Sequence, residues 1–159
     1  MNEITNSLAP AKQLDLFLAK YDPEIEKLAR AALKKLRALM PGAIQMVYDN
    51  YNALVVGFCA TEKSSEAVLS IALYPKWVTL FFLQGKGLTD PKKLLKGSGT
   101  TVRNIRLEDL SPLKNADVDA LLDLAIAKSK SPFGPKEGGK LIIKSISERQ
   151  RPRRSELND

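Results

Sequence analysis

Residues 74–107 read YPKWVTLFFLQGKGLTDPKKLLKGSGTTVRNIRL. The stretch begins with a strongly apolar run from Trp77 to Gln84, continues through a loop rich in glycine and lysine, and ends with the run Thr101 to Leu107. Runs rich in aromatic and β-branched residues, separated by glycine-containing loops, are typical of paired strands. We therefore expect a strand, a loop with one short turn, and a returning strand.

Upstream of this unit, the pattern changes from helical to extended. Apolar residues recur at three- and four-residue spacing in residues 10–20 and 23–40, which predicts two amphipathic helices. The sequence Asp22-Pro23-Glu24 is typical of a helix start, and Pro41-Gly42 of a helix end. Short turns between the next apolar runs favour an antiparallel sheet. The predicted strands there are Ile44–Tyr48, Ala53–Thr61 and Ala67–Tyr74.

Downstream, one more helix is expected, starting at Asn115 or Asp117, and the chain beyond Ser131 is rich in Pro, Gly, Lys and Arg. We expect only residues 141–143 of that part to dock on the body, and residues 150–159 to be mobile. The sequence thus predicts an α+β fold in which a mainly antiparallel sheet of about five strands packs on N-terminal and C-terminal helices. It would form a single domain in residues 1–130, followed by a basic, partly disordered tail in residues 131–159.

The predicted strands do not alternate cleanly between polar and apolar residues. In ALVVGFCA (residues 53–60) and WVTLFFL (residues 77–83), both faces are largely apolar. Helices can cover one face of such a sheet, so the other must be covered by another element, a second subunit or a ligand. We therefore expect a homodimer or a lined cavity.

Composition excludes several chemistries. The 159 residues contain no histidine and a single cysteine, Cys59, so one chain cannot build a Ser-His-Asp triad, a histidine-containing zinc site or a cysteine-rich cluster. We expect no cofactor, and an enzyme is the least favoured class. No apolar run reaches the ~20 residues of a membrane span, and the first residues lack a signal-peptide pattern. With the lone cysteine, this predicts a cytoplasmic protein.

The formal net charge of +7 is concentrated near the C-terminus. Residues 128–159 carry nine Lys or Arg and four Asp or Glu, a net charge of +5, which leaves +2 for the rest. Nucleic-acid contact through these arginines is one alternative, and a solubilising terminus is the commoner use of such a segment. Because the body is near neutral, nucleic acid is a disfavoured partner. The arginines concerned are Arg149, Arg151, Arg153 and Arg154.

Two other basic groups admit competing interpretations. Lys27, Arg30, Lys34 and Arg37 recur on one face of the second predicted helix, as a phosphate-binding ridge or, more commonly, as a solvated surface with an intrahelical Glu26–Arg30 pair. In the loop, Lys86, Lys93, Lys96 and Arg103 could bind an anion, although neither a Walker A sequence nor G-x-G-x-x-G is present. The structural alternative is a turn that Asp90 caps, that Leu94 and Leu95 anchor, and that Gly97 ends.

The loop and its flanking strands resemble the hallmark of the YdhG-like bacterial domain-of-unknown-function family. In that pattern an apolar strand leads through G-x-x-L-x-D-P-x-x-L-L-x-G-x-G to R-x-(I/V)-(K/R), and the resemblance covers roughly residues 12–128. The matching residues are Gly85, Leu88, Asp90, Pro91, Leu94, Leu95, Gly97, Gly99, Arg103 and Ile105.

This resemblance implies a curved antiparallel sheet packed on helices, similar to frataxin-like or TBP-like layouts. Some family members carry a frataxin-like label, which implies iron handling for iron–sulfur assembly. That role requires many carboxylate ligands. Here only a loose acidic group is present near the helix junction, including Asp22, Glu24 and Glu26. The iron-binding function is therefore kept as an alternative.

The resulting hypothesis is a non-enzymatic binding protein for a small or anionic ligand or a protein partner. The expected ligand-binding residues are Tyr48, Tyr51, Lys86, Lys93 and Arg103. Tyr74 and Trp77 also lie near strand ends, where aromatic residues line ligand sites or simply pack. Asp49 lies in a DNYN turn, where a bond from its side chain to the backbone is expected.

Overall fold

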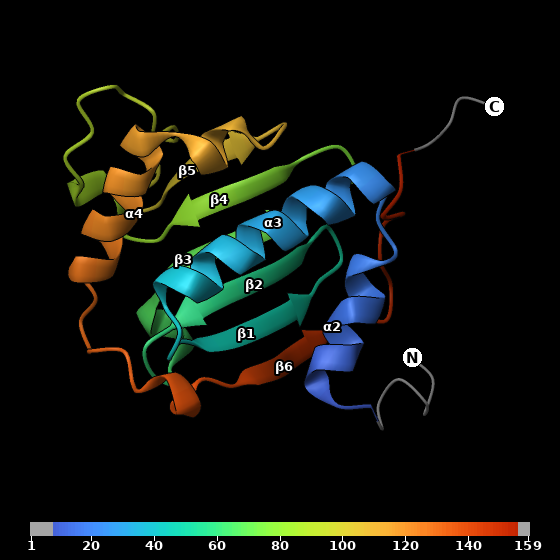
Figure 1. Ribbon diagram of the computed structural model, residues 1–159. Coiled ribbons are helices and arrows are strands. Elements are labelled where there is room, and N and C mark those ends of the chain that lie inside the picture. Colours follow the sequence, from blue (N-terminus) through green and yellow to red (C-terminus); the bar gives the residue numbers. More distant parts are fainter. Residues whose placement is uncertain (1–7, 156–159) are drawn as a thin grey trace.

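Six strands form one sheet, and three α-helices lie against one of its faces within the part of the chain that the structure describes (Figure 1). The structure is a computed structural model and describes residues 8–155. The strand order is β5-β4-β3-β2-β1-β6. The helices are α2 (Pro10–Leu18), α3 (Pro23–Leu39) and α4 (Ala116–Ala127), and the strands are β1 (Ile44–Asp49), β2 (Leu54–Cys59), β3 (Ala67–Leu73), β4 (Val78–Phe82), β5 (Arg103–Leu107) and β6 (Leu141–Ile146). Short 3₁₀ turns are η1 (Ser64–Glu66), η2 (Gly85–Gly87), η3 (Ser111–Lys114) and η4 (Lys136–Gly138).

The helices begin and end where the sequence predicts. Pro23 occupies the first turn of α3, with Asp22 at the N-cap position, and the helix ends just before Pro41. In α4, the Asn115 side chain accepts hydrogen bonds from the backbone N–H groups of Asp117 at 2.7 Å and Val118 at 3.4 Å. These two bonds satisfy donors that the first helical turn leaves without partners.

Strands β1 to β5 form the expected antiparallel meander, since each pairs with the next strand along the chain. Val47 lies opposite Val56, and Ile71 lies opposite Leu80. Directly opposite residues share a face, so the register fixes which side chains meet the helices. The α+β class and the mainly antiparallel sheet are thereby confirmed.

A sixth strand corrects the expectation of about five strands. Strand β6 pairs with β1 in parallel, with Met46 opposite Ile142. It lies in the segment that was expected to be a tail, so the sheet extends beyond the predicted boundary at residue 130. Residues 141–143 do dock, as predicted. A parallel partner needs a long crossover connection, and residues 50–140 provide it.

The core lies between the sheet and the helices. Alternate residues of β2 and β3, such as Val56 and Ile71, pack against the buried stripe of α3, which includes Leu28 and Leu36. Val118 and Leu122 of α4 belong to the same cluster. One continuous apolar core therefore joins all three helices to the sheet.

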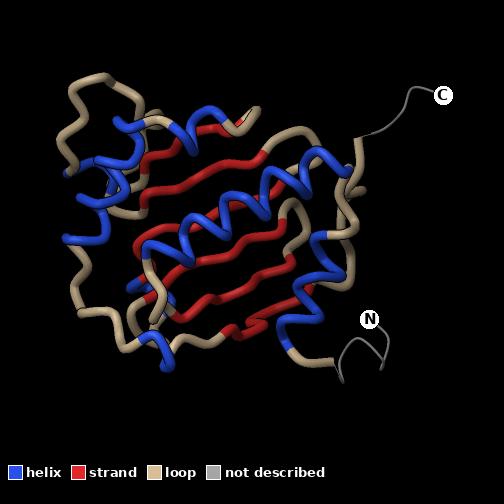
Figure 2. Tube along the Cα trace, viewed as in Figure 1, coloured by secondary structure: helices blue, strands red, loops and turns tan. Residues whose placement is uncertain are grey.

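The opposite face of the sheet carries none of these α-helices (Figure 2). As the sequence indicated, it is largely apolar, but its centre is built from small residues. Gly57, Ser70 and Ala72 are buried there, and Phe81 and Val55 beside them are half-buried. We call this the uncovered face. A second subunit that covers it stays a prediction.

Candidate functional site

The segment after β6 continues across the end of the sheet, from the β1–β2 turn to the β3–β4 turn, and completes a groove. The backbone N–H of Ser147 donates to the Asp49 carbonyl at 2.9 Å, and that of Arg151 donates to the Tyr51 carbonyl at 2.9 Å. The N–H of Ser155 donates to the Asp22 carboxylate at 3.2 Å. Residues 147–155, here called the C-terminal segment, are therefore tied to the β1–β2 turn and to the start of α3. The expectation that only residues 141–143 of the chain beyond Ser131 dock is therefore wrong, and residues 156–159 lie outside the described residues.

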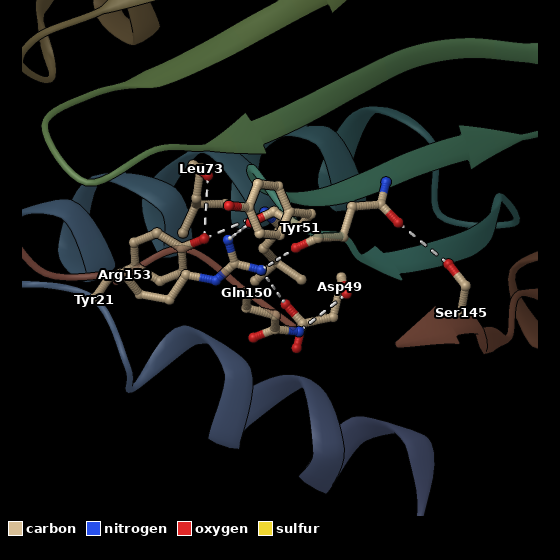
Figure 3. Close-up of polar contacts among 9 residues, drawn as sticks. Tyr21, Asp49, Tyr51, Leu73, Ser145, Gln150 and Arg153 are labelled. Carbon is tan, nitrogen blue, oxygen red and sulfur yellow. Dashed lines mark hydrogen bonds and ion pairs between the residues drawn. The ribbon is translucent and has the colours of Figure 1, made fainter. Parts of the chain in front are cut away.

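A buried ion pair anchors this segment (Figure 3). Arg153 Nη2 lies 2.9 Å from Asp49 Oδ1, and the two side chains are only 4% and 1% exposed. The guanidinium also donates to the carbonyl oxygens of Asn50 and, at 3.3 Å, Tyr51. Asp49 ends β1 on the helix-facing side, so its carboxylate points into the molecule. It binds Arg153 and not its own turn, which corrects the sequence-based expectation.

Tyr21, between α2 and α3, links this anchor to the sheet (Figure 3). Its hydroxyl donates to the Leu73 carbonyl at 3.1 Å and accepts from the Leu54 N–H at 3.2 Å. Its ring centre lies 5.8 Å from the Arg153 guanidinium carbon. Burial raises the pKa of Tyr21 to about 12, against a smaller lowering by Arg153. Tyr21 thus stays neutral and acts as a structural hydrogen-bonding group.

A groove of about 660 Å³ lies between the C-terminal segment and the β3–β4 turn. We call it the C-terminal groove. It is lined by Asn52, Tyr74, Pro75, Lys76, Trp77, Arg151, Pro152, Arg154 and Ser155.

Aromatic rings form one side of the C-terminal groove. The rings of Tyr74 and Trp77 are 5.5 Å apart and tilted by 33°. The guanidinium carbon of Arg106 lies 3.5 Å from the centre of the Trp77 ring. Such contacts are worth about 0.5–1 kcal/mol at exposed sites and hold the rings in place. The β3–β4 turn therefore presents a fixed apolar surface to the groove.

Two arginines of the C-terminal segment lie on the other side, and Lys76 adds a cation on the same turn as the aromatic rings. Lys76 is exposed on the turn, and Arg151 lies across the groove with its guanidinium carbon 5.4 Å from the Tyr51 ring centre. Arg154 Nη1 is 3.9 Å from Asp22 Oδ1. Within residues 8–155, neither Lys76 nor Arg151 forms an ion pair with a carboxylate. The groove thus combines excess positive charge with aromatic surface, which suits an anion that carries a ring.

The predicted ligand-binding residues do not form one site. Tyr48 and Tyr51 lie at the end of β1 and in the turn after it, at the same end of the sheet as the start of β4. Lys86 and Lys93 lie in the loop after β4, which is at the opposite end of the sheet. The structure brings only Tyr51 close to the C-terminal groove, through its contact with Arg151.

Arg103 and its loop have a structural role. Arg103 Nη1 donates to the carbonyls of Gly99 at 2.6 Å and Val102 at 2.7 Å, so the guanidinium closes the loop from within. A Cβ on Gly85 would lie 2.6 Å from the Cβ of Arg103, which explains why glycine occupies this position. As predicted, the Asp90 carboxylate caps the turn, because it accepts from the N–H of Leu94 at 3.0 Å and of Leu95 at 2.8 Å. The hydrogen bonds of the Arg103 guanidinium and of the Asp90 carboxylate are thus made within the loop itself.

Two of the three carboxylates of the iron-binding alternative contact other side chains or backbone groups. Asp22 contacts Ser155 and Arg154, and Glu26 accepts from Arg30 Nε at 2.9 Å. Glu24 is exposed in the first turn of α3. Among residues 8–155, no group of three or more acidic or cysteine side chains is placed to hold a metal ion.

The arginines of the nucleic-acid alternative divide into two kinds. Arg153 is buried in the ion pair, whereas Arg149, Arg151 and Arg154 are exposed. Arg151 and Arg154 line the C-terminal groove, and Arg149 does not. Sequence reasoning found these arginines and the nearby aromatic residues separately. It missed Lys76 and the pairing of the two groups, because Trp77 and Arg151 are 74 positions apart and no local signal connects them.

Comparison of the chain with family models, with curated proteins and with solved structures found no match. None of the helices in the described residues has the length and apolar character needed to cross a membrane. Cys59 is buried, and desolvation by burial raises the pKa of its thiol, as expected for a residue that serves as a small apolar side chain.

Proposed function

We propose that this chain is a non-enzymatic binding protein, and that the C-terminal groove holds a small anion with a planar ring, of the mononucleotide class. One observation carries the proposal: Lys76, Arg151 and Arg154 meet the Tyr74–Trp77 pair around a single groove. Its volume of about 660 Å³ falls within the range of about 300–1,000 Å³ typical of small-molecule sites.

The two sides of the groove would recognise different parts of such a ligand. Guanidinium groups form charge-assisted, bidentate hydrogen bonds with phosphate, so Arg151 and Arg154 are suited to the anionic part. Aromatic side chains offer a planar apolar surface to a base. The Tyr74 and Trp77 rings are suited to that part.

The other expectations from the sequence remain proposals. The resemblance to the YdhG-like family, its curved frataxin-like or TBP-like layout, and the cytoplasmic location stay predictions. Iron binding receives less support than the groove, because Asp22 and Glu26 are paired with arginines. Nucleic-acid binding would use the same exposed arginines, so oligonucleotides belong in the same experiment.

Isothermal titration calorimetry with ATP, AMP and adenosine at low salt tests the proposal. We expect saturable binding of ATP that Arg151→Gln and Lys76→Gln each weaken by about tenfold, the effect of one lost hydrogen bond to a charged group. Arg149→Gln is the matched control, because this arginine is exposed in the same segment but does not line the groove. Adenosine should bind more weakly than either nucleotide.

Three results would overturn the proposal. Failure of ATP and AMP to bind saturably would remove the ligand class. Equal losses in the Arg149→Gln and Arg151→Gln variants would show that general attraction to a basic segment, and not the groove, causes binding. If a single-stranded oligonucleotide binds much more tightly than ATP, the groove is a nucleic-acid-binding site and not a mononucleotide site.

A further inference from the structure

A second groove, of about 400 Å³, lies between α2, α3 and the start of β6. We call it the helix groove. Its lining is Ala11, Leu14, Asp15, Leu18, Arg30, Leu33, Arg37, Pro41, Ala43, Gln45, Gly139, Lys140 and Leu141. It shares no residue with the C-terminal groove.

The base of the helix groove is apolar. Leu14, Leu18 and Leu33 belong to the main core and are almost fully buried. Leu141 of β6 packs against the same core and is half-buried. An apolar group that entered the groove would therefore lie against the core and be removed from water, which favours binding.

Three cations line the groove, and two of them have carboxylate partners. Arg30 Nη1 lies 3.0 Å from Asp15 Oδ1, and Arg30 Nε lies 2.9 Å from Glu26. Lys140 Nζ lies 2.7 Å from Glu62. These two cations and three carboxylates are paired with one another, so they offer no free positive charge to a ligand.

Arg37 is different. Its Nε donates to the neutral Gln45 Oε1 at 2.8 Å, which fixes the guanidinium at the groove. Neither of its Nη atoms forms a hydrogen bond or ion pair with any of residues 8–155. Desolvation lowers the pKa of Arg37, and Arg30 lowers it further against an opposing effect of Asp15. Arg37 thus has a free pair of donors, in the geometry that binds a carboxylate.

We propose that the helix groove binds a medium-chain carboxylic acid, with its carboxylate on the two Nη groups of Arg37 and its apolar chain over Leu14, Leu18 and Leu33. A carboxylate fits because the guanidinium edge is planar and bidentate. An apolar chain fits because the base of the groove carries no polar side chain. This site is independent of the proposed nucleotide site.

The test is calorimetric titration of the whole chain with octanoate, and with octanol and acetate as probes that each lack one half of the ligand. We expect saturable octanoate binding that is at least about tenfold tighter than that of either probe, because charge-assisted hydrogen bonds and apolar burial both contribute. Arg37→Gln should weaken octanoate binding by about tenfold. Lys34→Gln is the matched control, since Lys34 is exposed on the same helix outside the groove.

A second variant tests the groove itself. Ala11 lies exposed on α2 at the groove, so Ala11→Leu should fill space while it preserves the helix and the charge. It should weaken octanoate binding and leave acetate binding unchanged. Octanoate binding that survives both Arg37→Gln and Ala11→Leu would overturn the proposal, as would octanol that binds as well as octanoate. Arg151→Gln should leave octanoate binding intact, so failure of either site is distinguishable from failure of the other.

Discussion

At the scale of single residues, Arg153 determines where the C-terminal segment lies. Its guanidinium joins Asp49 to the carbonyls of Asn50 and Tyr51 in a site that excludes water. Arg153→Met should lower the free energy of unfolding by about 3–5 kcal/mol, because it leaves the Asp49 carboxylate buried without a partner. Urea denaturation followed by circular dichroism measures this loss.

The control for this prediction is the double variant Asp49→Leu/Arg153→Met. It removes both charges, so it should regain part of the stability that the single variant loses. A loss below about 1 kcal/mol in the single variant would contradict the argument, since that is the range of exposed pairs.

Tyr21 gives a second prediction, which concerns pH. Burial raises its folded-state pKa to about 12 from an ordinary value of 10.0. Below pH 10 the hydroxyl is protonated in both states, and its contribution to stability is complete. Between pH 10 and 12 only the unfolded chain loses this proton. Stability should therefore fall by about 1.4 kcal/mol per pH unit in that window through this residue alone.

Tyr21→Phe isolates the contribution of this residue. At pH 7 the variant should be less stable by about 1–3 kcal/mol, because the Leu54 N–H and the Leu73 carbonyl lose their buried partner. The difference in stability between wild type and variant, followed by urea denaturation, should shrink from pH 10 to 12. A constant difference over this range would contradict the assigned pKa.

At the scale of elements, strand β6 offers a comparison between its two faces. Ile143 lies on the helix-facing side and packs against the core, whereas its neighbour Ile142 lies on the uncovered face. Ile143→Ala should cost about 1–2 kcal/mol in the free energy of unfolding, and Ile142→Ala less, because less apolar contact is lost there. Equal losses, measured by urea denaturation, would contradict the observed register.

Local signals predicted most elements of the fold. Pro23 and Pro41-Gly42 bracket α3 because both limits depend on nearby residues. The antiparallel order of β1 to β4 followed from short turns for the same reason, and β5 was expected as the strand that returns after the loop. Strand β6 was not predicted, because its three leading apolar residues, Leu141 to Ile143, are followed by a lysine and a serine and do not form a longer apolar run. Its partner β1 lies about ninety residues earlier, and nothing local specifies a parallel pairing over such a distance.

The candidate sites were less predictable than the fold, because both depend on contacts between distant residues. Asp49 and Arg153 are 104 positions apart, and each has an ordinary local explanation as a turn residue or part of a basic tail. Arg103 shows the opposite error: its place beside glycines and lysines suggested an anion site, yet its donors are used by the carbonyls of its own loop. Spacing in sequence shows which polar groups are present, but not which of them already have hydrogen-bond partners in the fold.

At the scale of the whole molecule, the last part of the described chain completes both grooves. Gly139, Lys140 and Leu141 line the helix groove, and Arg151, Pro152, Arg154 and Ser155 line the C-terminal groove. Strand β6, which lies between these two parts of the chain, forms one edge of the sheet. The buried pair of Asp49 and Arg153 therefore has a consequence beyond stability, since undocking of the C-terminal segment would remove one wall of the proposed nucleotide site.

This dependence predicts that the nucleotide and the docked segment stabilise each other. The N–H of Arg151 is bonded to the Tyr51 carbonyl, so its hydrogen exchange reports undocking. If only the docked form binds ATP, ATP at 100 times its dissociation constant should slow this exchange by about a hundredfold. The N–H of Leu95, bonded to Asp90 at the other end of the sheet, is the internal control and should change little if it exchanges by local opening. Equal slowing at both amides would mean that ATP stabilises the fold as a whole, and unchanged exchange at Arg151 would mean that the segment is no part of the site.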